Sequence, residues 1–263
     1  MRLAFRVAYL GGGFAGSQMQ PNARTVEGEF IAACERLILF PDWREARFAF
    51  SGRTDRGVHA RGQVAAFDTE EAERALLALN PQLPRDCWCT AYAEVDESFH
   101  PRHDARSRTY RYYMPGIDLN IDEMDRAAHL FQGRHDFSCL ARVEEGHSPD
   151  RVVLSSHVRE EGDFTVFEVR GESFLWNMVR CMTTVLQWVG AGLAKADLVT
   201  DLLEGRCDER PAAAPAEGLI LWDVEYDVPF LPLPQDRRSR AFLDATRRHH
   251  AVMERICQDL QNP

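Results

Sequence analysis

The sequence predicts an α+β fold, in which two mixed halves share a mostly antiparallel sheet and leave a cleft for the active site between them. Strand-like and helix-like patterns alternate through both halves of the 263 residues. Connections compatible with antiparallel pairing outnumber long crossovers, and no low-complexity linker interrupts the chain. We expect the halves to span residues 1–104 and 105–228, followed by a basic helical tail over 229–263.

In the first half, the pattern predicts strand, helix, strand, strand, helix, strand. Residues 2–10 alternate as a strand does and end in a glycine-rich turn at 11–16. Thr25 is a candidate N-cap for the first helix, whose apolar residues share one face. The later elements are expected at residues 47–50, 63–67, 70–79 and 87–95.

In the second half, an aromatic strand is expected over 106–114, followed by a helix over 122–131 that stops at Gly133. Gly162 and Asp163 separate two strand patterns and predict a hairpin. The prolines after residue 228 break the pattern ahead of a basic helix. The remaining elements are strands at 152–160, 164–169 and 219–226 and helices at 174–193, 196–203 and 237–260.

The composition is that of a globular protein, with 45% hydrophobic and 27% charged residues. No apolar run approaches a membrane span, and the N-terminus lacks the apolar core of a signal peptide, so we expect a cytoplasmic protein without a membrane partner. The seven cysteines are scattered without a C-x-x-C pair, and we expect them to be small buried residues. No metal site, His/Asp cluster at ligand spacing or cofactor motif is found.

The net charge of −10 argues against a nucleic-acid partner only if the charge is spread evenly. Arginines gather in three places, at residues 51–63, 101–115 and 237–255. Of the 31 basic residues only Lys195 is a lysine, and arginine suits RNA because it forks onto phosphates and stacks on bases. A GC-rich genome would produce the same excess, so the clustering is the stronger indication.

Three segments hold residues suited to chemistry. Residues 51–60, Ser-Gly-Arg-Thr-Asp-Arg-Gly-Val-His-Ala, present Asp55 on a loop bracketed by glycines. An isolated aspartate there would merely cap the turn. Residues 108–112 place Tyr110 and Tyr112 on one strand face. Residues 173–180 end in Arg180, a cation among apolar neighbours, which is unusual without a partner.

Together these segments resemble the motifs of the TruA family of tRNA pseudouridine synthases: G-R-T-D-x-G-V-H-A, a basic-x-Tyr-x-Tyr strand and F-L-x-x-M-V-R. The resemblance implies that Asp55 is the catalytic residue, that Tyr110 packs against the target base and that Arg180 pairs with Asp55. Arg53 takes the place of the family's arginine and is expected to bind substrate. Weaker matches lie at residues 133–137 and 214–219.

The resemblance to the family extends to about residue 227, and the sequence departs from the family pattern at three positions. Leu10 and Ser17 stand where the family commonly has Asp and Trp, and Arg56 stands where alanine is frequent. We expect Arg56, His59 and Arg61 to contact RNA.

The resemblance implies two similar ferredoxin- or RRM-like halves and a homodimer. The implied activity is the cofactor-free, metal-free isomerisation of uridine to pseudouridine in the tRNA anticodon stem-loop, at about positions 38–40, on an extruded nucleotide. Asp55 could attack the ribose, attack the base or remove a sugar proton. Three other hypotheses are a non-catalytic RNA-binding protein, an acid hydrolase built on Asp55, and a synthase acting on another RNA.

Overall fold

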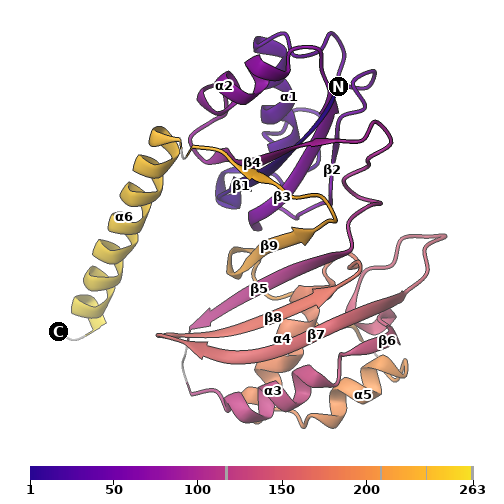
Figure 1. The fold of residues 1–263 in the computed structure, drawn as a ribbon. Coiled ribbons are helices and arrows are strands. Elements are labelled where there is room, and N and C mark those ends of the chain that lie inside the picture. The colour runs from indigo at the N-terminus through magenta and orange to yellow at the C-terminus, as the bar shows by residue number, and fades with distance from the viewer. Residues whose placement is uncertain (116–117, 208, 235, 262–263) are drawn as a thin grey trace.

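A computed structural model describes residues 1–115, 118–207, 209–234 and 236–261. Its centre is a ten-stranded sheet in the order β10-β4-β1-β3-β9-β5-β8-β7-β6, with β2 paired to β3 (Figure 1). Within the described residues, the β3–β9 pair is parallel and the other ladders are antiparallel. The predicted α+β class with a mostly antiparallel sheet is therefore confirmed.

The first half follows the predicted order of elements. Thr25 caps the first helix as expected, because its hydroxyl oxygen accepts a hydrogen bond from the backbone N–H of Gly28 at 3.2 Å. Phe5 and Phe30 pack the first strand against that helix. The elements are β1 (Arg2–Tyr9), α1 (Val26–Arg36), β2 (Ala49–Phe50), β3 (His59–Asp68), α2 (Ala72–Gln82) and β4 (Cys87–Val95), with the 3-10 turn η1 (Gly11–Gly13) after β1.

The second half contains the predicted hairpin and three helices. One helix lies behind the hairpin strands and the other two are drawn below them (Figure 1). The short strands β6 and β10 and the 3-10 turns were not predicted, because elements of a few residues leave no periodic pattern. The elements are β5 (Ser107–Pro115), α3 (Ile121–His129), β6 (Gly133–Asp136), η2 (Ser138–Leu140), β7 (Asp150–Glu161), β8 (Phe164–Gly171), α4 (Met178–Gly190), α5 (Asp197–Leu203), η3 (Ala216–Gly218), β9 (Leu219–Glu225) and β10 (Leu231–Pro232).

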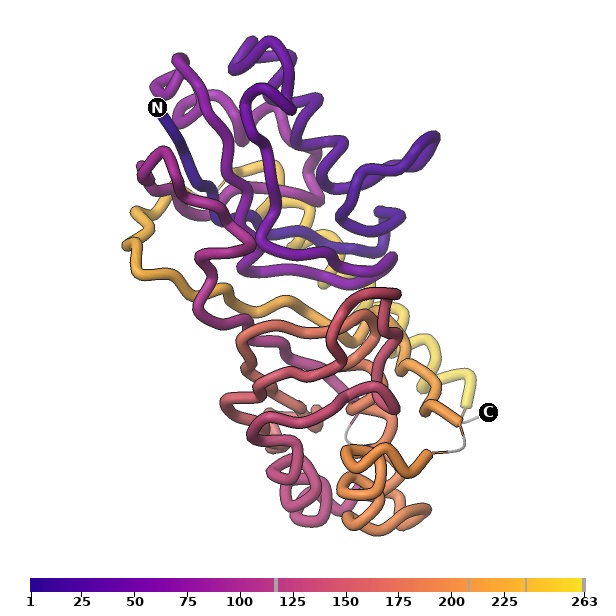
Figure 2. The backbone as a smooth tube through the Cα atoms, turned by 90° about the vertical axis from the view of Figure 1, so that its right-hand side faces the viewer, coloured from indigo at the N-terminus to yellow at the C-terminus, as the bar shows by residue number. Residues whose placement is uncertain are grey.

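Strand β9 joins the two halves. It pairs with β3 on one side and with β5 on the other, so one sheet runs through both halves. Figure 2 shows this orange segment passing between the two halves. Each half keeps its own core, and Leu221 of β9 packs in the first core whereas Leu219 packs in the second. Tyr110 touches both cores. The division at residues 104 and 228 stays a prediction.

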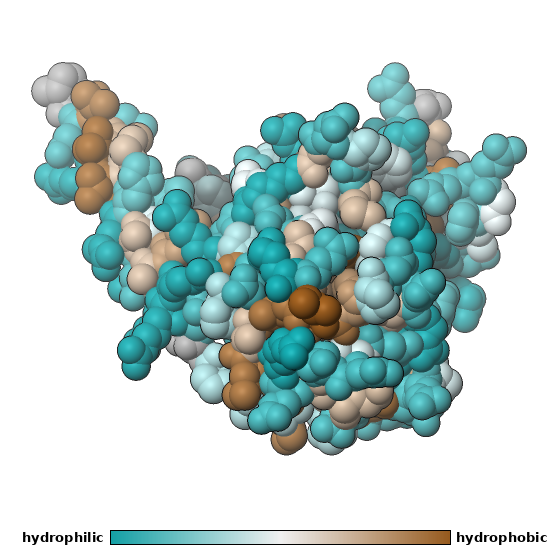
Figure 3. Space-filling model, turned by 90° about the horizontal axis from the view of Figure 1, so that it is seen from above, coloured by the Kyte–Doolittle hydropathy of each residue, from teal (hydrophilic) through white to brown (hydrophobic). Residues whose placement is uncertain are grey.

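Helix α6 (Arg237–Gln261) is anchored at its start, where Arg238 donates to the Leu83 carbonyl and Arg85 lies over the Phe242 ring, and its later turns stand away from the rest of the molecule (Figures 1 and 3). Of its residues only Ser239 is buried, and the apolar side chains of Val252, Ile256 and Leu260 are exposed. No described helix is long and apolar enough to cross a membrane. The predicted basic tail helix is present, and it has an apolar stripe without a partner in a single chain.

Two expectations from the sequence need correction. Cys34, Cys87, Cys89 and Cys181 are buried free thiols as expected, but Cys139 and Cys207 form a disulfide and Cys257 is exposed. The disulfide was not foreseen because 68 residues separate the two cysteines, and only the packing of α5 on η2 brings their segments together. The helix expected from residue 174 begins only at Met178, since Asn177 has a positive φ of 65°.

Candidate active site

The loop that carries Asp55 connects β2 to β3 and is held by buried hydrogen bonds on both sides of Thr54. The backbone N–H of Thr54 donates to the Ser17 hydroxyl at 2.7 Å, and the N–H of Ser17 donates to the Thr54 carbonyl at 3.0 Å. The hydroxyls of Tyr9 and Thr54 lie 2.8 Å apart. Residue 54 is therefore fixed, and the Asp55 side chain that follows it remains 31% exposed.

Two glycines give this loop its shape. Gly57 has a φ of +87°, which allows the sharp turn between Asp55 and β3. Gly11 lies so close to the loop that a Cβ there would sit 2.0 Å from the carbonyl oxygen of Val58. The Gln63 amide also donates to the Gly52 carbonyl at 2.8 Å. The glycine-rich turn after β1 is thus a support for the Asp55 loop.

Arg180, in the first turn of α4, reaches across from the second half and binds Asp55. The Nη1 atom of Arg180 lies 3.1 Å from Asp55 Oδ2 and 3.3 Å from the side-chain oxygen of Asn177. Its Nε donates to the Ala214 carbonyl at 2.6 Å. A cation in the first turn is disfavoured by the helix dipole, and the Asp55 carboxylate offsets that cost. The predicted Asp55–Arg180 pair is present, as a charge-assisted bond between the halves.

Tyr110, on β5, lies beside this pair. Its ring is half-buried and meets the ring of Phe174 edge-on, at 5.2 Å between centroids. Burial raises the pKa of Tyr110 to about 12; the Arg108 charge opposes this rise and the Asp55 charge adds to it. The phenol is therefore neutral at physiological pH, and the charge of Asp55 disfavours its ionisation.

The segment 214–217 supports the site through its backbone carbonyls. Ala214 binds Arg180 twice, since its N–H also donates to the Arg180 carbonyl at 3.2 Å. Pro215 accepts from the Tyr112 hydroxyl at 2.9 Å, and Glu217 accepts from His59 at 3.2 Å. The sequence match at 214–219 marked this segment but gave it no role, because a backbone acceptor leaves no signature in residue types.

His59 connects η1 to η3. The Gly11 N–H donates to His59 Nδ1 at 2.9 Å, which assigns the ring proton to Nε2 and makes Nε2 the donor to Glu217. Burial lowers the pKa of His59, in the direction of a neutral ring. Both ring nitrogens are thus occupied by protein, and the expected RNA contact of His59 stays a prediction.

The structure separates the three loop arginines. Arg53 and Arg56 are exposed on the Asp55 loop; the Arg53 guanidinium lies 3.8 Å from Glu144, and Arg56 makes no ion pair among the described residues. Arg61 instead stacks on Trp222 at 4.4 Å, together with Arg111 at 3.7 Å. Arg111 alternates with Tyr110 along β5, so Arg61 lies on the sheet face opposite Tyr110.

Two further features were missed from the sequence. Trp176, 45% exposed, precedes Asn177, and the guanidinium of Arg142 covers its ring at 4.4 Å. The Arg142 N–H also donates to the Trp176 carbonyl at 2.8 Å. The signal available in the sequence was an aromatic residue just before an apolar helix.

The second missed residue is Arg108, whose guanidinium donates to the carbonyls of Ser51, Arg102 and Glu172. It ties the start of the Asp55 loop to the loop after β8. Burial lowers the pKa of Arg108. The signal for Arg108 in the sequence was the basic position two residues before Tyr110 in the family motif. In the structure Arg108 supports the site by holding these loops together.

Comparison with known proteins shows which family this chain resembles. A family model described as tRNA pseudouridine synthase matches residues 127–227. A protein of Methanoculleus marisnigri named tRNA pseudouridine synthase A is 56% identical over 99% of this chain and 96% of its own length. Proteins of the same name from Methanosphaerula palustris (53%, 97% and 91%) and Thermococcus kodakarensis (43%, 86% and 85%) also match. The chain therefore belongs to the TruA family of tRNA pseudouridine synthases.

Proposed function

We propose that the protein isomerises uridine to pseudouridine in tRNA, with Asp55 as its catalytic carboxylate. The observation that carries the proposal is the bond from Arg180 to Asp55, which joins the two halves at a loop fixed from both sides. In this reaction the bond between uracil N1 and ribose C1′ breaks, the base turns, a bond from C5 to C1′ forms, and the C5 proton leaves while N1 gains one. Atoms and electrons balance without an oxidant or reductant.

In this proposal Arg180 is a positioning residue. Its three acceptors fix the guanidinium and so aim the Asp55 carboxylate at the nucleotide. Asp55 then acts on the ribose, on the base or on a sugar proton. Tyr110 packs against uracil as a neutral phenol; with a pKa raised to about 12, it is a poor acceptor for the C5 proton at neutral pH.

The target nucleotide has to leave its stack to reach Asp55. Arg53 and Arg56 are exposed beside the carboxylate and are proposed to hold phosphates. Trp176 has the exposed ring that an unstacked base needs, and Arg142 already holds that ring in place. Trp176→Ala is expected to weaken binding of tRNA, measured by fluorescence anisotropy, more than it lowers the turnover of bound tRNA.

We further propose that the substrate site is the anticodon stem-loop, at about positions 38–40, that the enzyme is a homodimer and that it works in the cytoplasm. Support for the dimer is the exposed apolar stripe of α6, which a second copy would cover. Sedimentation equilibrium tests it: a monomer at micromolar concentration would contradict the dimer. Support for the cytoplasm is the tRNA substrate of the family; the Cys139–Cys207 disulfide is unusual in that compartment.

The test of the activity is tritium release from C5-labelled uridine in unmodified tRNA transcripts, with ribosomal RNA fragments in parallel. We expect release from tRNA and not from the fragments, and primer extension after carbodiimide treatment should then stop in the anticodon arm. Release from the fragments alone would assign the site to another RNA. No release from any RNA, by folded protein that binds tRNA, would favour a non-catalytic RNA-binding protein.

A further inference from the structure

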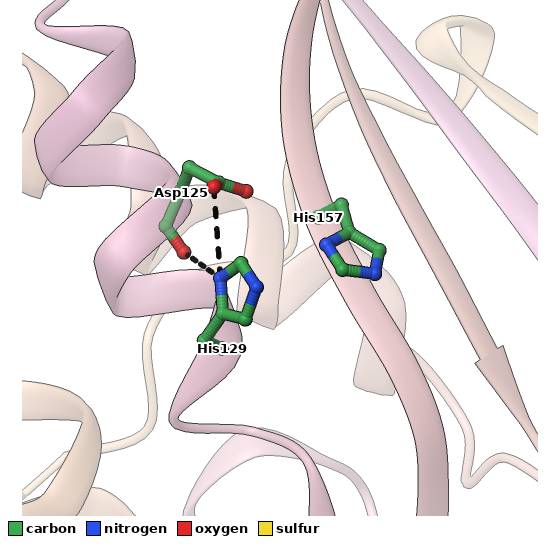
Figure 4. A group of neighbouring side chains, drawn as sticks. All are labelled: Asp125, His129 and His157. Atoms are coloured by element: carbon green, nitrogen blue, oxygen red, sulfur yellow. Dashed lines mark hydrogen bonds and ion pairs between the residues drawn. The ribbon is translucent and has the colours of Figure 1, made fainter.

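A second cluster of polar side chains lies away from Asp55, where α3 packs on β7. One ligand atom each from Asp125, His129 and His157 lies within 4.8 Å of the others (Figure 4). Asp125 and His129 are four residues apart on one face of α3, and His157 comes from the neighbouring strand. The absence of a His/Asp cluster expected from the sequence is thus corrected: the spacing along the chain does not indicate this cluster, because its third member is distant in the sequence.

Two of the three side chains are oriented by hydrogen bonds that leave a ligand atom free. Asp125 Oδ1 accepts from the Val158 N–H at 2.8 Å, and its other oxygen lies 3.6 Å from His129 Nδ1. His129 Nδ1 lies 2.7 Å from the Asp125 carbonyl oxygen, which assigns it the ring proton and leaves the lone pair on Nε2. A histidine that binds a metal through one ring nitrogen usually donates the N–H of the other to a carbonyl or carboxylate oxygen.

The third side chain has no competing bond. Among the described residues His157 makes no hydrogen bond or ion pair, and its ring meets that of His129 edge-on at 4.8 Å between centroids. An ordinary i,i+4 pair at the helix C-terminus would explain Asp125 and His129 by themselves. It gives no reason for an unpaired imidazole from β7 to face the same point.

We propose that Asp125, His129 and His157 bind a divalent transition metal of the zinc class. Two imidazoles and one carboxylate are a zinc-type donor set, whereas Ca²⁺ and Mg²⁺ prefer oxygen ligands. Ligand bonds of about 2.0–2.1 Å place tetrahedral ligands roughly 3.3 Å apart, so the cluster contracts by a side-chain rotation. His157 makes no hydrogen bond or ion pair among the described residues and can make this rotation. Water completes the coordination.

The role of such a metal would be structural. Strand β8 separates β7 from β5, which carries Tyr110, so the cluster is not part of the proposed catalytic centre. The metal would fasten the end of α3 to β7, next to the edge strand β6. Its binding stabilises the folded state and leaves the turnover of tRNA unchanged.

The test titrates chelator-treated protein with ZnCl₂ in a Cys257→Ser background, because Cys257 is an exposed free thiol and thiolates are zinc ligands. Isothermal titration should give one Zn²⁺ per chain, and Tm should rise by roughly 5–10 °C at 100 times the Kd. His157→Ala should abolish both effects and leave the metal-free Tm nearly unchanged, since no hydrogen bond or ion pair of His157 among the described residues is lost. His147→Ala, at an exposed histidine elsewhere, is the control that should bind normally. Absence of stoichiometric binding, or equal binding by His157→Ala, overturns the proposal.

Discussion

Arg180→Lys is the substitution that most clearly separates geometry from charge at the site. Lysine keeps the positive charge near Asp55 but has one nitrogen in place of the planar fork. The arginine uses Nη1 for Asp55 and Asn177 and Nε for the Ala214 carbonyl. A lysine cannot satisfy both directions, so either Asp55 or the Ala214 carbonyl loses its donor.

The expected magnitude follows from that loss. A hydrogen bond to a charged group contributes about 1.5–3 kcal/mol, and both contacts are of this kind. If the orientation of the carboxylate is needed in the transition state, losing this hydrogen bond raises the activation free energy of the reaction by the same amount. In that case kcat/KM falls roughly 10- to 150-fold. Because Arg180 acts on the carboxylate and not on the RNA, KM should change little.

The assay is steady-state tritium release with tRNA, and Arg206→Lys is the matched control, since Arg206 is an exposed arginine paired with Asp201 and Glu204. The control should keep the wild-type rate. A thermal melt of each variant separates lost activity from lost folding. Wild-type kcat in a folded Arg180→Lys enzyme would refute the view that the guanidinium fork positions Asp55.

Three other predictions concern the support of the site. Tyr110→Phe keeps the packing ring, so kcat for tritium release should fall less than about tenfold; a larger fall would make the phenol a proton acceptor. Ser17→Ala leaves the buried Thr54 N–H without its acceptor and should lower the urea-derived free energy of unfolding by about 1–3 kcal/mol, and an unchanged value would contradict the support role of Ser17. Burial lowers the pKa of His59, so below its ordinary pKa of about 6.5 the unfolded state binds more protons. The His59 contribution to stability is therefore complete above that pH and declines as pH falls through the folded pKa; His59→Gln should reduce this slope between pH 7 and 5, and an identical slope would contradict it.

The predictable part of the fold is the part written in short-range patterns. Apolar alternation located β1 and the β7–β8 hairpin, and the capping signal at Thr25 located the start of α1. Pairing over long distances was out of reach. Nothing in residues 219–225 shows that β9 inserts between β3 and β5, because a strand pattern specifies its own conformation and not its neighbours.

The same division applies to the site. The Asp55–Arg180 contact could be predicted because each residue stands in a motif with a known partner. The start of α4 could not be predicted, because it depends on the positive φ of Asn177. This backbone turn leaves the Trp176 carbonyl available to accept from the Arg142 N–H. Ser17 was identified only as a departure from the family, although its hydroxyl receives the N–H next to Asp55. Side-chain chemistry leaves a pattern in the sequence, and the local backbone geometry that aims it does not.

The central claim is that Asp55 performs the isomerisation, and Asp55→Asn tests it most directly. Asparagine keeps the size of the side chain and a hydrogen-bond acceptor for Arg180 but removes the ionised carboxylate. Single-turnover tritium release from tRNA should vanish in the variant, while the melt and the Kd for tRNA stay close to wild type. Release at the wild-type rate by folded Asp55→Asn would contradict the account and place the catalytic group elsewhere.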